Sequence, residues 1–180
     1  MSNFLLCEAG PEHNLAIRTM IMKILNEEYA MGLRLAELPD LIDVYDTYCS
    51  DGPGNFWIAL NNGLVCGCIG LMFLGRGDFE LRRMYVEEGA RGHGLAQRLL
   101  DVLFDWSAAN GVESIYLETN HRWHAAHHIY EKNGFTAVGK DELPREFPIV
   151  RVATGFYRLQ LVRPVSALTT RPRRVKAHDL

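Results

Sequence analysis

Apolar side chains follow two different periods along this chain, and segments with the strand period alternate with segments with the helical period. Two apolar stretches, 56–60 and 64–74, flank Asn61-Asn62-Gly63, which predicts a β-hairpin. From Leu95 onward the apolar residues instead recur at helical spacing, up to a predicted C-cap at Asn110-Gly111. Such an order is typical of a mixed sheet with helices on its faces, so we expect an α/β (α+β) fold.

The remaining elements follow from the same two periods. Besides the hairpin, we expect strands at residues 3–7, 79–86, 114–118, 135–138 and 148–161, and helices at 11–29, 37–48 and 124–132.

Length and charge limit the class of protein. The 180 residues suit one domain, and a formal net charge of −3 argues against sequence-independent binding of nucleic acid. The longest apolar run, 64–74, contains two glycines and falls short of the ~18–20 residues of a bilayer span. The first residues lack the basic start of a secretory signal. We therefore expect a cytoplasmic protein that binds neither nucleic acid nor a membrane.

The four cysteines form no CxxC pair. We expect reduced, mostly buried thiols, with Cys66 and Cys68 on one face of their strand. The charge is uneven, because basic residues predominate from Arg163 to the end. We divide the chain into a single domain, 1–162, and a basic C-terminal tail, 163–180, whose charges we interpret as solvated rather than as a binding patch.

The most informative stretch is the glycine-rich junction between strand 79–86 and the helix that begins at Leu95. The first turn of a helix offers unpaired N–H groups, and Gly92 and Gly94 allow an anion to approach the backbone. The third glycine of a dinucleotide fingerprint and the Lys-Ser/Thr pair of a P-loop are both missing. The junction indicates a phosphate site, and a helix that merely starts with glycines is the alternative.

The sequence of this junction, Arg91-Gly-His-Gly-Leu-Ala96, matches the pattern R-x-x-G-x-A. Together with Glu80-Leu-Arg-Arg-Met-Tyr-Val86 before it and the segment Ala126–Phe135 after it, the chain resembles the GNAT superfamily of acyl-CoA-dependent N-acetyltransferases from Gly54 to about Leu159. The resemblance implies a mostly antiparallel central sheet that is splayed between its fourth and fifth strands.

The resemblance also implies where acetyl-CoA, the expected co-substrate, would bind. Its pyrophosphate would lie on the backbone of the junction, and its pantetheine arm would pair with the end of the preceding strand. These expectations correspond to Arg91, Gly92, Gly94, Leu95 and Ala96 for the pyrophosphate, and to Met84 and Val86 for the arm.

Two side chains are candidates for catalysis. Tyr130 matches the tyrosine that the family places near the sulfur of CoA, where it would act as general acid; packing against the sheet is the alternative. Glu80 matches a position where family members carry a carboxylate base, with an ion pair to Arg82 or Arg83 as an equal alternative. Strand alternation places Glu80, Arg82 and Met84 on one face.

One position departs from the family pattern. Trp123 stands where an asparagine often contacts the pantetheine region, so either Asn120 takes over this contact or the contact is absent. Nearby, His124 and His128 have the i, i+4 spacing of metal ligands, but no further ligand completes a site, and we expect no metal. The neighbouring His121 and His127 are interpreted in the same way.

The predicted function is acetyl transfer from acetyl-CoA to a primary amine by direct attack in a ternary complex. The alternative is a non-catalytic acyl-CoA sensor or interaction module on the same fold. The acceptor is a small molecule or a peptide or protein amine, and a homodimer is left open. Four acidic residues could attract a cationic acceptor or merely solvate a helix: Asp40, Asp43, Asp46 and Asp51.

Overall fold

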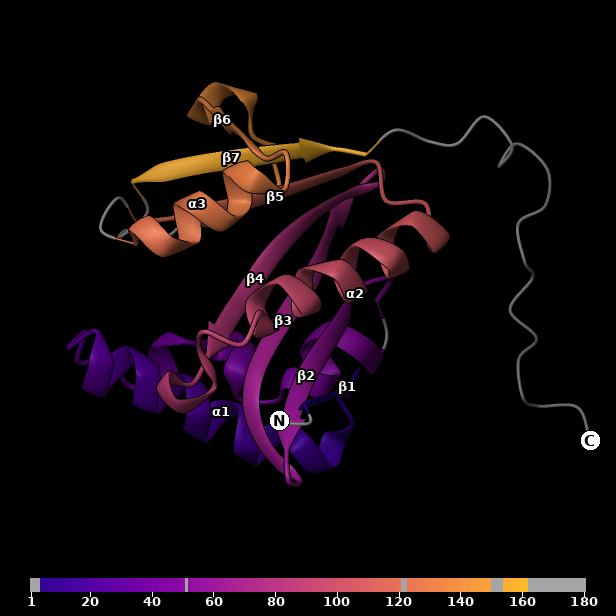
Figure 1. The fold of residues 1–180 in the computed structure, drawn as a ribbon. Helices are drawn as coiled ribbons and strands as arrows, with labels where there is room; N and C mark the ends of the chain where they lie inside the picture. Colours follow the sequence, from indigo (N-terminus) through magenta and orange to yellow (C-terminus); the bar gives the residue numbers. More distant parts are fainter. Residues whose placement is uncertain (1–3, 51, 121–122, 150–153, 162–180) are drawn as a thin grey trace, which may run out of the picture.

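In the part of the chain that the computed structural model describes, residues 4–50, 52–120, 123–149 and 154–161, seven strands form one sheet in the order β1-β2-β3-β4-β5-β7-β6 (Figure 1). The strands are β1 (Phe4–Glu8), β2 (Asn55–Asn61), β3 (Leu64–Gly75), β4 (Asp78–Val86), β5 (Ser114–Thr119), β6 (Thr136–Val138) and β7 (Gly155–Gln160). The helices are α1 (Asn14–Lys23), α2 (Leu95–Ala109) and α3 (His124–Lys132). All pairs are antiparallel except β4–β5, which is parallel.

The sheet opens between β4 and β5. These two strands pair only from Asp78 with Ser114 to Glu80 with Tyr116, after which both continue without pairing to each other. Figure 1 shows them diverging, with β5, β7 and β6 forming the upper leaf of the sheet. The expected splay between the fourth and fifth strands is confirmed.

Helices cover both faces, as expected, because each strand alternates between two apolar clusters (Figure 1). Trp57 and Ala59 of β2 join Leu99 and Leu103 of α2 in a cluster that we call the α2-side core. Phe56 and Ile58 instead join Ile17 of α1 and its neighbours in the α1-side core. α3 packs on the α2 side through Tyr130. The apolar stripe of each helix therefore fixes the side of the sheet that it covers.

The ladders of β3 with β2 and β4 contain three register shifts, and two of them change the side on which predicted residues lie. In β3, Cys66 is left between the pairs Ala59–Gly67 and Leu60–Val65, so Cys66 lies in the α2-side core and Cys68 in the α1-side core. The expectation that both cysteines share a face is wrong, because a bulge shifts the alternation by one residue. The structure contains both thiols as free, buried cysteines.

The second bulge lies in β4, directly beside the opening. Arg83 and Met84 together face one residue of β3, and Arg83 has a left-handed backbone with φ of +54°. Met84 therefore packs on the α2-side core, whereas Arg82 contacts Met72 on the opposite side. The prediction that Glu80, Arg82 and Met84 share one face is wrong for Met84.

Most predicted elements appear, and the N-terminal helices differ. The expected helix 11–29 is α1 preceded by a 3-10 turn and followed by a π-helical turn at Ile24–Glu28. The expected helix 37–48 is instead broken into short turns, because Asp40 turns inward toward the sheet. The last strand is shorter than expected at Gly155–Gln160. Residues 150–153 and the tail 163–180 lie outside the described residues.

Candidate functional site

A groove of about 300 Å³ lies where β4 ends and α2 begins. It brings together six of the predicted cofactor residues: Val86, Arg91, Gly92, Gly94, Leu95 and Ala96. Met84 and Asn120 are not among its lining residues. Met84 precedes the groove by two residues and faces the same core as Val86. The predicted junction and the end of the predicted strand thus form one continuous surface.

The two glycines of the junction have left-handed backbones, with φ of +79° at Gly92 and +71° at Gly94. A Cβ atom at either position would meet no heavy atom within 4 Å, so the space beside them is open. Gly94 is the N-cap of α2, and the next N–H groups of the helix have no carbonyl partner within it. The junction therefore presents accessible N–H donors at the positive end of a helix dipole.

Two basic side chains line the groove, and their surroundings differ. The Arg91 guanidinium donates a hydrogen bond to the Val86 carbonyl at 2.9 Å and pairs with Glu28, so its charge is partly neutralised. Lys132, at the end of α3, lines the groove and forms no ion pair with any residue that the structure describes. Lys132 is thus a cation of this groove that no described carboxylate neutralises.

Five lining residues were not among the predicted cofactor residues: Ala90, Gln97, His128, Ile129 and Lys132. Gln97 and Asn133 exchange two hydrogen bonds of 2.7 and 3.0 Å, which fasten the start of α2 to the end of α3. The available signal was the helical spacing of His128 and Lys132, which places both on one face of α3. That face could not be assigned to the groove without the packing of α3.

Glu80 lies at the last paired position of β4 and β5, where the strands part. Its side chain is 1% exposed, and its Oε1 is 3.4 Å from Nε of Arg82. Its Oε2 is buried and has no hydrogen-bond partner among the described residues. Burial raises the pKa of Glu80 to about 7, although the nearby Arg82 opposes this increase. The group thus combines the predicted ion pair with an unsatisfied, weakly acidic carboxyl oxygen.

Arg83, the other candidate partner of Glu80, pairs with Asp40 instead. Its Nε and Nη2 donate hydrogen bonds of 2.7 and 2.6 Å to the two carboxylate oxygens. Tyr48 donates a further hydrogen bond of 2.8 Å to Asp40. Burial alone would raise the pKa of Asp40, but Arg83 outweighs burial and lowers it. This buried ion pair stabilises Arg83, the residue of the β4 bulge that has a left-handed backbone.

The acidic residues of the N-terminal region do not act as one group. Asp40 is 6% exposed and is satisfied by Arg83. Asp43 accepts hydrogen bonds from Asn14 and from the backbone of Asp46, and Asp46 accepts one from Ser50. Asp51 lies outside the described residues. Hydrogen bonds and the ion pair with Arg83 therefore account for the three carboxylates that the structure describes.

Tyr130 is buried at 7% exposure in the α2-side core, with its ring against Phe135 and Tyr157. Burial raises the pKa of its hydroxyl, with smaller contributions from Tyr85 and Tyr29. The hydroxyl therefore keeps its proton at neutral pH. The packing role and the donor role of Tyr130 both stay predictions.

Asn120 lies just after β5, and its backbone carbonyl accepts a hydrogen bond from Trp123 and lies 2.9 Å from Nε2 of His127. The other nitrogen of His127 lies 2.9 Å from the Tyr157 hydroxyl. His127 is thus a structural link between α3 and β7. His121 and the side chain of His124 lie outside the described residues.

In the part of the chain that the structure describes, no cluster of three or more His, Cys, Asp or Glu side chains is arranged to hold a metal ion. Within the same ranges, no helix has the length and apolar character needed to cross a bilayer.

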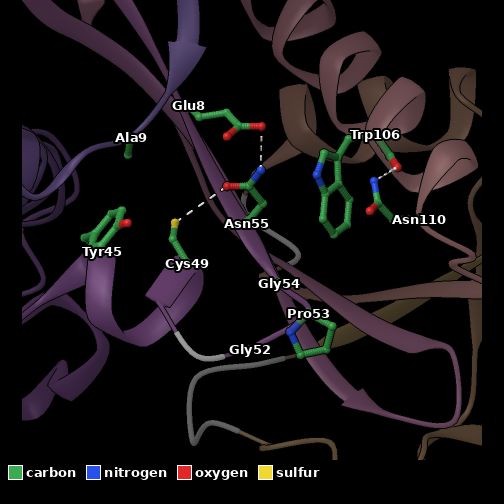
Figure 2. Close-up of a pocket in the computed structure, with 10 residues that line it drawn as sticks. All are labelled: Glu8, Ala9, Tyr45, Cys49, Gly52, Pro53, Gly54, Asn55, Trp106 and Asn110. Atoms are coloured by element: carbon green, nitrogen blue, oxygen red, sulfur yellow. Dashed lines mark hydrogen bonds between the residues drawn. The ribbon is translucent and has the colours of Figure 1, made fainter. Parts of the chain in front are cut away.

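A second cavity of about 500 Å³ lies near the opposite end of α2, beside Trp106 and Asn110 (Figure 2). Figure 2 shows Asn55 donating to Glu8 and accepting from the Cys49 thiol, and Asn110 donating to the Trp106 carbonyl. It contains none of the predicted site residues. The groove at the start of α2 and the opening at Glu80 are therefore the candidate functional site.

Comparison with known proteins gives consistent relatives. A family model described as "Acetyltransferase (GNAT) family" matches residues 18–135. An N-acetylaspartate synthetase of Danio rerio is 31% identical over 134 residues, which cover 68% of this chain and 47% of that protein. An IAA acetyltransferase of Azospirillum brasilense is 33% identical over 114 residues, 63% of this chain and 73% of that protein. The chain spans about half the length of the first curated relatives it matches.

Solved structures agree in fold. A GNAT-family acetyltransferase of Staphylococcus aureus superposes with a TM-score of 0.84 at 28% sequence identity, over 89% of this chain and 100% of that one. An acetyltransferase of Streptococcus agalactiae superposes with a TM-score of 0.81 at 24% identity, again over 89% and 100%.

Proposed function

This chain belongs to the acetyltransferase (GNAT) family, and from that premise we propose that it transfers the acetyl group of acetyl-CoA to a primary amine by direct attack in a ternary complex. The observation that carries the proposal is the parting of β4 and β5 at Glu80, a buried carboxyl with one unsatisfied oxygen. A gap between strands admits an extended thioester arm, and the carboxyl at its closed end has a suitable pKa for accepting a proton near neutral pH.

The groove supports the binding of acetyl-CoA. Its open glycine backbone and the first turn of α2 suit a pyrophosphate, and Lys132 adds a positive charge that no described carboxylate neutralises. Beyond Glu80, β4 makes no pairs with β5, so the Met84–Val86 backbone edge is available to the pantetheine amides on that side. The arm would thereby extend from the groove toward Glu80.

The chemical step then needs three proton transfers. The ammonium group of the acceptor loses a proton to Glu80, and the free amine attacks the thioester carbon. The C–N bond forms and the C–S bond breaks, so the electron pair of the C–S bond leaves on sulfur. Tyr130, which burial keeps protonated, donates a proton to that sulfur and regains it from solvent. Solvent takes the second proton of the nitrogen as the amide forms, and Glu80 releases its own proton to solvent, so that the products are the N-acetyl compound, CoA and one proton.

The similar proteins suggest one class of acceptor amine. Two N-acetylaspartate synthetases, from Danio rerio and Xenopus tropicalis, are 31% and 34% identical to this chain over their matched residues. Their names describe products acetylated on the nitrogen of an amino acid. We therefore include amino acids among the amines to be screened.

Gly94 and Gly111 provide a matched test of the binding site. They lie at opposite ends of α2, have φ of +71° and +72°, and have open space beside Cα. A glutamate at either position incurs a similar backbone strain of about 1 kcal/mol. Gly94→Glu additionally places bulk and negative charge in the groove, so calorimetry should show acetyl-CoA binding lost in Gly94→Glu and retained in Gly111→Glu. Equal affinities in two folded variants would refute the assignment.

Turnover requires a separate measurement. Release of free CoA during incubation with acetyl-CoA and a panel of primary amines should depend on the amine and yield the N-acetyl product. Binding of acetyl-CoA without amine-dependent release of CoA across the panel would instead favour a non-catalytic acyl-CoA sensor.

A further inference from the structure

Arg82 is a second charged side chain at the opening, and the mechanism above does not use it. It lies two residues from Glu80 on the same face of β4, and its side chain is 17% exposed. Its one hydrogen bond goes from Nη1 to the sulfur of Met72 at 3.7 Å, which is a weak acceptor. Among the residues that the structure describes, no oxygen accepts a hydrogen bond from this guanidinium, which has five N–H donors.

The neighbouring Arg83 shows the contrast. It is buried to a similar degree, at 10% exposure, but two of its nitrogens donate to both oxygens of Asp40. Its charge and its geometry are satisfied by one carboxylate in a bidentate arrangement. Arg82 has no such partner in the described residues, although a guanidinium in a partly buried site is stabilised by the same kind of partner.

Glu80, in contrast, has an oxygen that lacks a hydrogen-bond donor among the described residues. Its Oε2 is buried and accepts no hydrogen bond from any residue that the structure describes, whereas buried polar atoms in proteins are almost always paired. The heads of the two side chains meet, since Oε1 of Glu80 is 3.4 Å from Nε of Arg82. The opening thus offers, side by side, one oxygen that lacks a donor and several donors that lack an oxygen.

An α-amino acid carries an ammonium group and a carboxylate on the same carbon, which matches this pair. We infer that Arg82 determines acceptor specificity by binding the α-carboxylate of an amino acid, while the amine to be acetylated binds at Oε2 of Glu80. This inference rests on the proposed function. A simple amine would satisfy Glu80 alone and leave the guanidinium without an oxygen partner, so it should be the poorer acceptor.

The position of the pair supports separate entry of the two substrates. The groove for acetyl-CoA is lined from α2 and α3, whereas Arg82 contacts Met72 on the α1 side of the sheet. On that side the apolar packing is divided into the α1-side core and a small cluster around Tyr116 and Phe156. Charged groups interact with Glu80 there: Arg82, Glu118, Asp40 and Arg83. A zwitterion is better suited to such surroundings than an apolar amine.

The test compares acceptors that differ only in the carboxylate. We would measure kcat/KM for L-alanine against ethylamine, L-phenylalanine against phenethylamine, and L-lysine against cadaverine. In the unmodified protein we expect the amino acid of at least one pair to be preferred about 10²-fold. Arg82→Gln should lower kcat/KM for that amino acid about 10²-fold and change that for its amine less than about threefold.

Two further variants test whether the preference depends on the bidentate geometry of Arg82 or only on its charge, and whether removal of any arginine has the same effect. Arg82→Lys keeps the charge but loses the bidentate geometry, so it should retain an intermediate preference. Arg76→Asn removes an exposed arginine with φ of +52° at the β3–β4 turn, a conformation that asparagine tolerates, and should leave the preference unchanged. Unchanged acetyl-CoA affinity would show that each variant is folded.

The outcomes distinguish this inference from the proposed function. Equal use of amino acid and amine by the unmodified protein, or an equal loss for both in Arg82→Gln, would overturn the inference while acetyl transfer stands. If no acceptor is acetylated, the proposed function fails, and calorimetry with the CoA-bound protein decides the inference. Binding of L-alanine, L-phenylalanine or L-lysine that Arg82→Gln abolishes would support it; absence of binding by all three would overturn it.

Discussion

Replacing Glu80 with glutamine should change the pH dependence of stability in a direction that the structure fixes. Burial raises the pKa of this carboxyl from its ordinary value of 4.5 to about 7 in the folded chain. The unfolded chain therefore releases the proton at lower pH than the folded chain. Between pH 4.5 and pH 7 the folded state binds more protons, so its stability falls as pH rises through this window. Above pH 7 the ionised Glu80 carboxylate lowers the unfolding free energy by its full amount, about 3 kcal/mol.

Glu80→Gln retains the shape of the side chain but cannot ionise. The unfolding free energy of Glu80→Gln minus that of the unmodified protein should therefore increase by about 2 to 3 kcal/mol from pH 5 to pH 8. Urea unfolding at several pH values, followed by tryptophan fluorescence, measures both proteins, and contributions from other titrating groups cancel in the difference.

Glu37→Gln is a control of opposite sign. Hydrogen bonds from the backbone and side chain of Arg34 lower the pKa of the exposed Glu37, so its removal should reduce stability more at high pH than at low pH. A difference between Glu80→Gln and the unmodified protein that stays constant from pH 5 to pH 8 would refute the reasoning. It would mean that the folded chain compensates the charge of Glu80 and leaves its pKa near the ordinary value.

Two further variants test the site and its support. Tyr130→Phe should lower kcat about 10²-fold with unchanged acetyl-CoA affinity by calorimetry, and normal turnover would leave Tyr130 with a packing role alone. Asp40→Ala should reduce the unfolding free energy by about 3 to 5 kcal/mol, because it leaves Arg83 buried without a partner, whereas Asp43→Ala should cost about 1 kcal/mol. Equal losses in urea titrations of the two aspartate variants would contradict the importance of the buried pair.

The sheet and its helices were predictable because local signals and tertiary structure agree. Asn61-Asn62-Gly63 forms the hairpin turn between β2 and β3, with positive φ at Asn62 and Gly63. Leu95, Leu99 and Leu103 are each at most 2% exposed, as the helical spacing predicts. The glycine-rich junction was likewise predictable, because its left-handed backbone is adopted readily by glycine, which has no Cβ.

The bulges were not predictable from alternation. A period of two assigns every second residue to a face, and one extra residue inverts the assignment for all that follow. Nothing local marks Arg83 for a left-handed backbone, since its stabilising partner, Asp40, lies 43 positions earlier in the chain. The same long-range pair explains the error at residues 37–48, where inward burial of Asp40 outweighs the helical pattern.

The place of each site residue depended on similar distant contacts. The sequence indicated Glu80 and two alternative partners, and only the fold showed that Arg83 is satisfied by Asp40 while Arg82 remains beside Glu80. Lys132 could not be assigned to the groove, because its position depends on how α3 packs against the start of α2.

The short ladder between β4 and β5 has a consequence for how the protein is made. Asp78 pairs with Ser114 across an intervening helix, and no hairpin joins the two strands. Such non-local parallel pairing is intrinsically slow, because the connecting chain must be ordered before the pairing is formed. The closed end of the opening is created only when both leaves of the sheet have come together. Intermediates in which either leaf is still unfolded therefore have no place for the reaction, and newly synthesised chains acquire the site only with this late joining of the leaves.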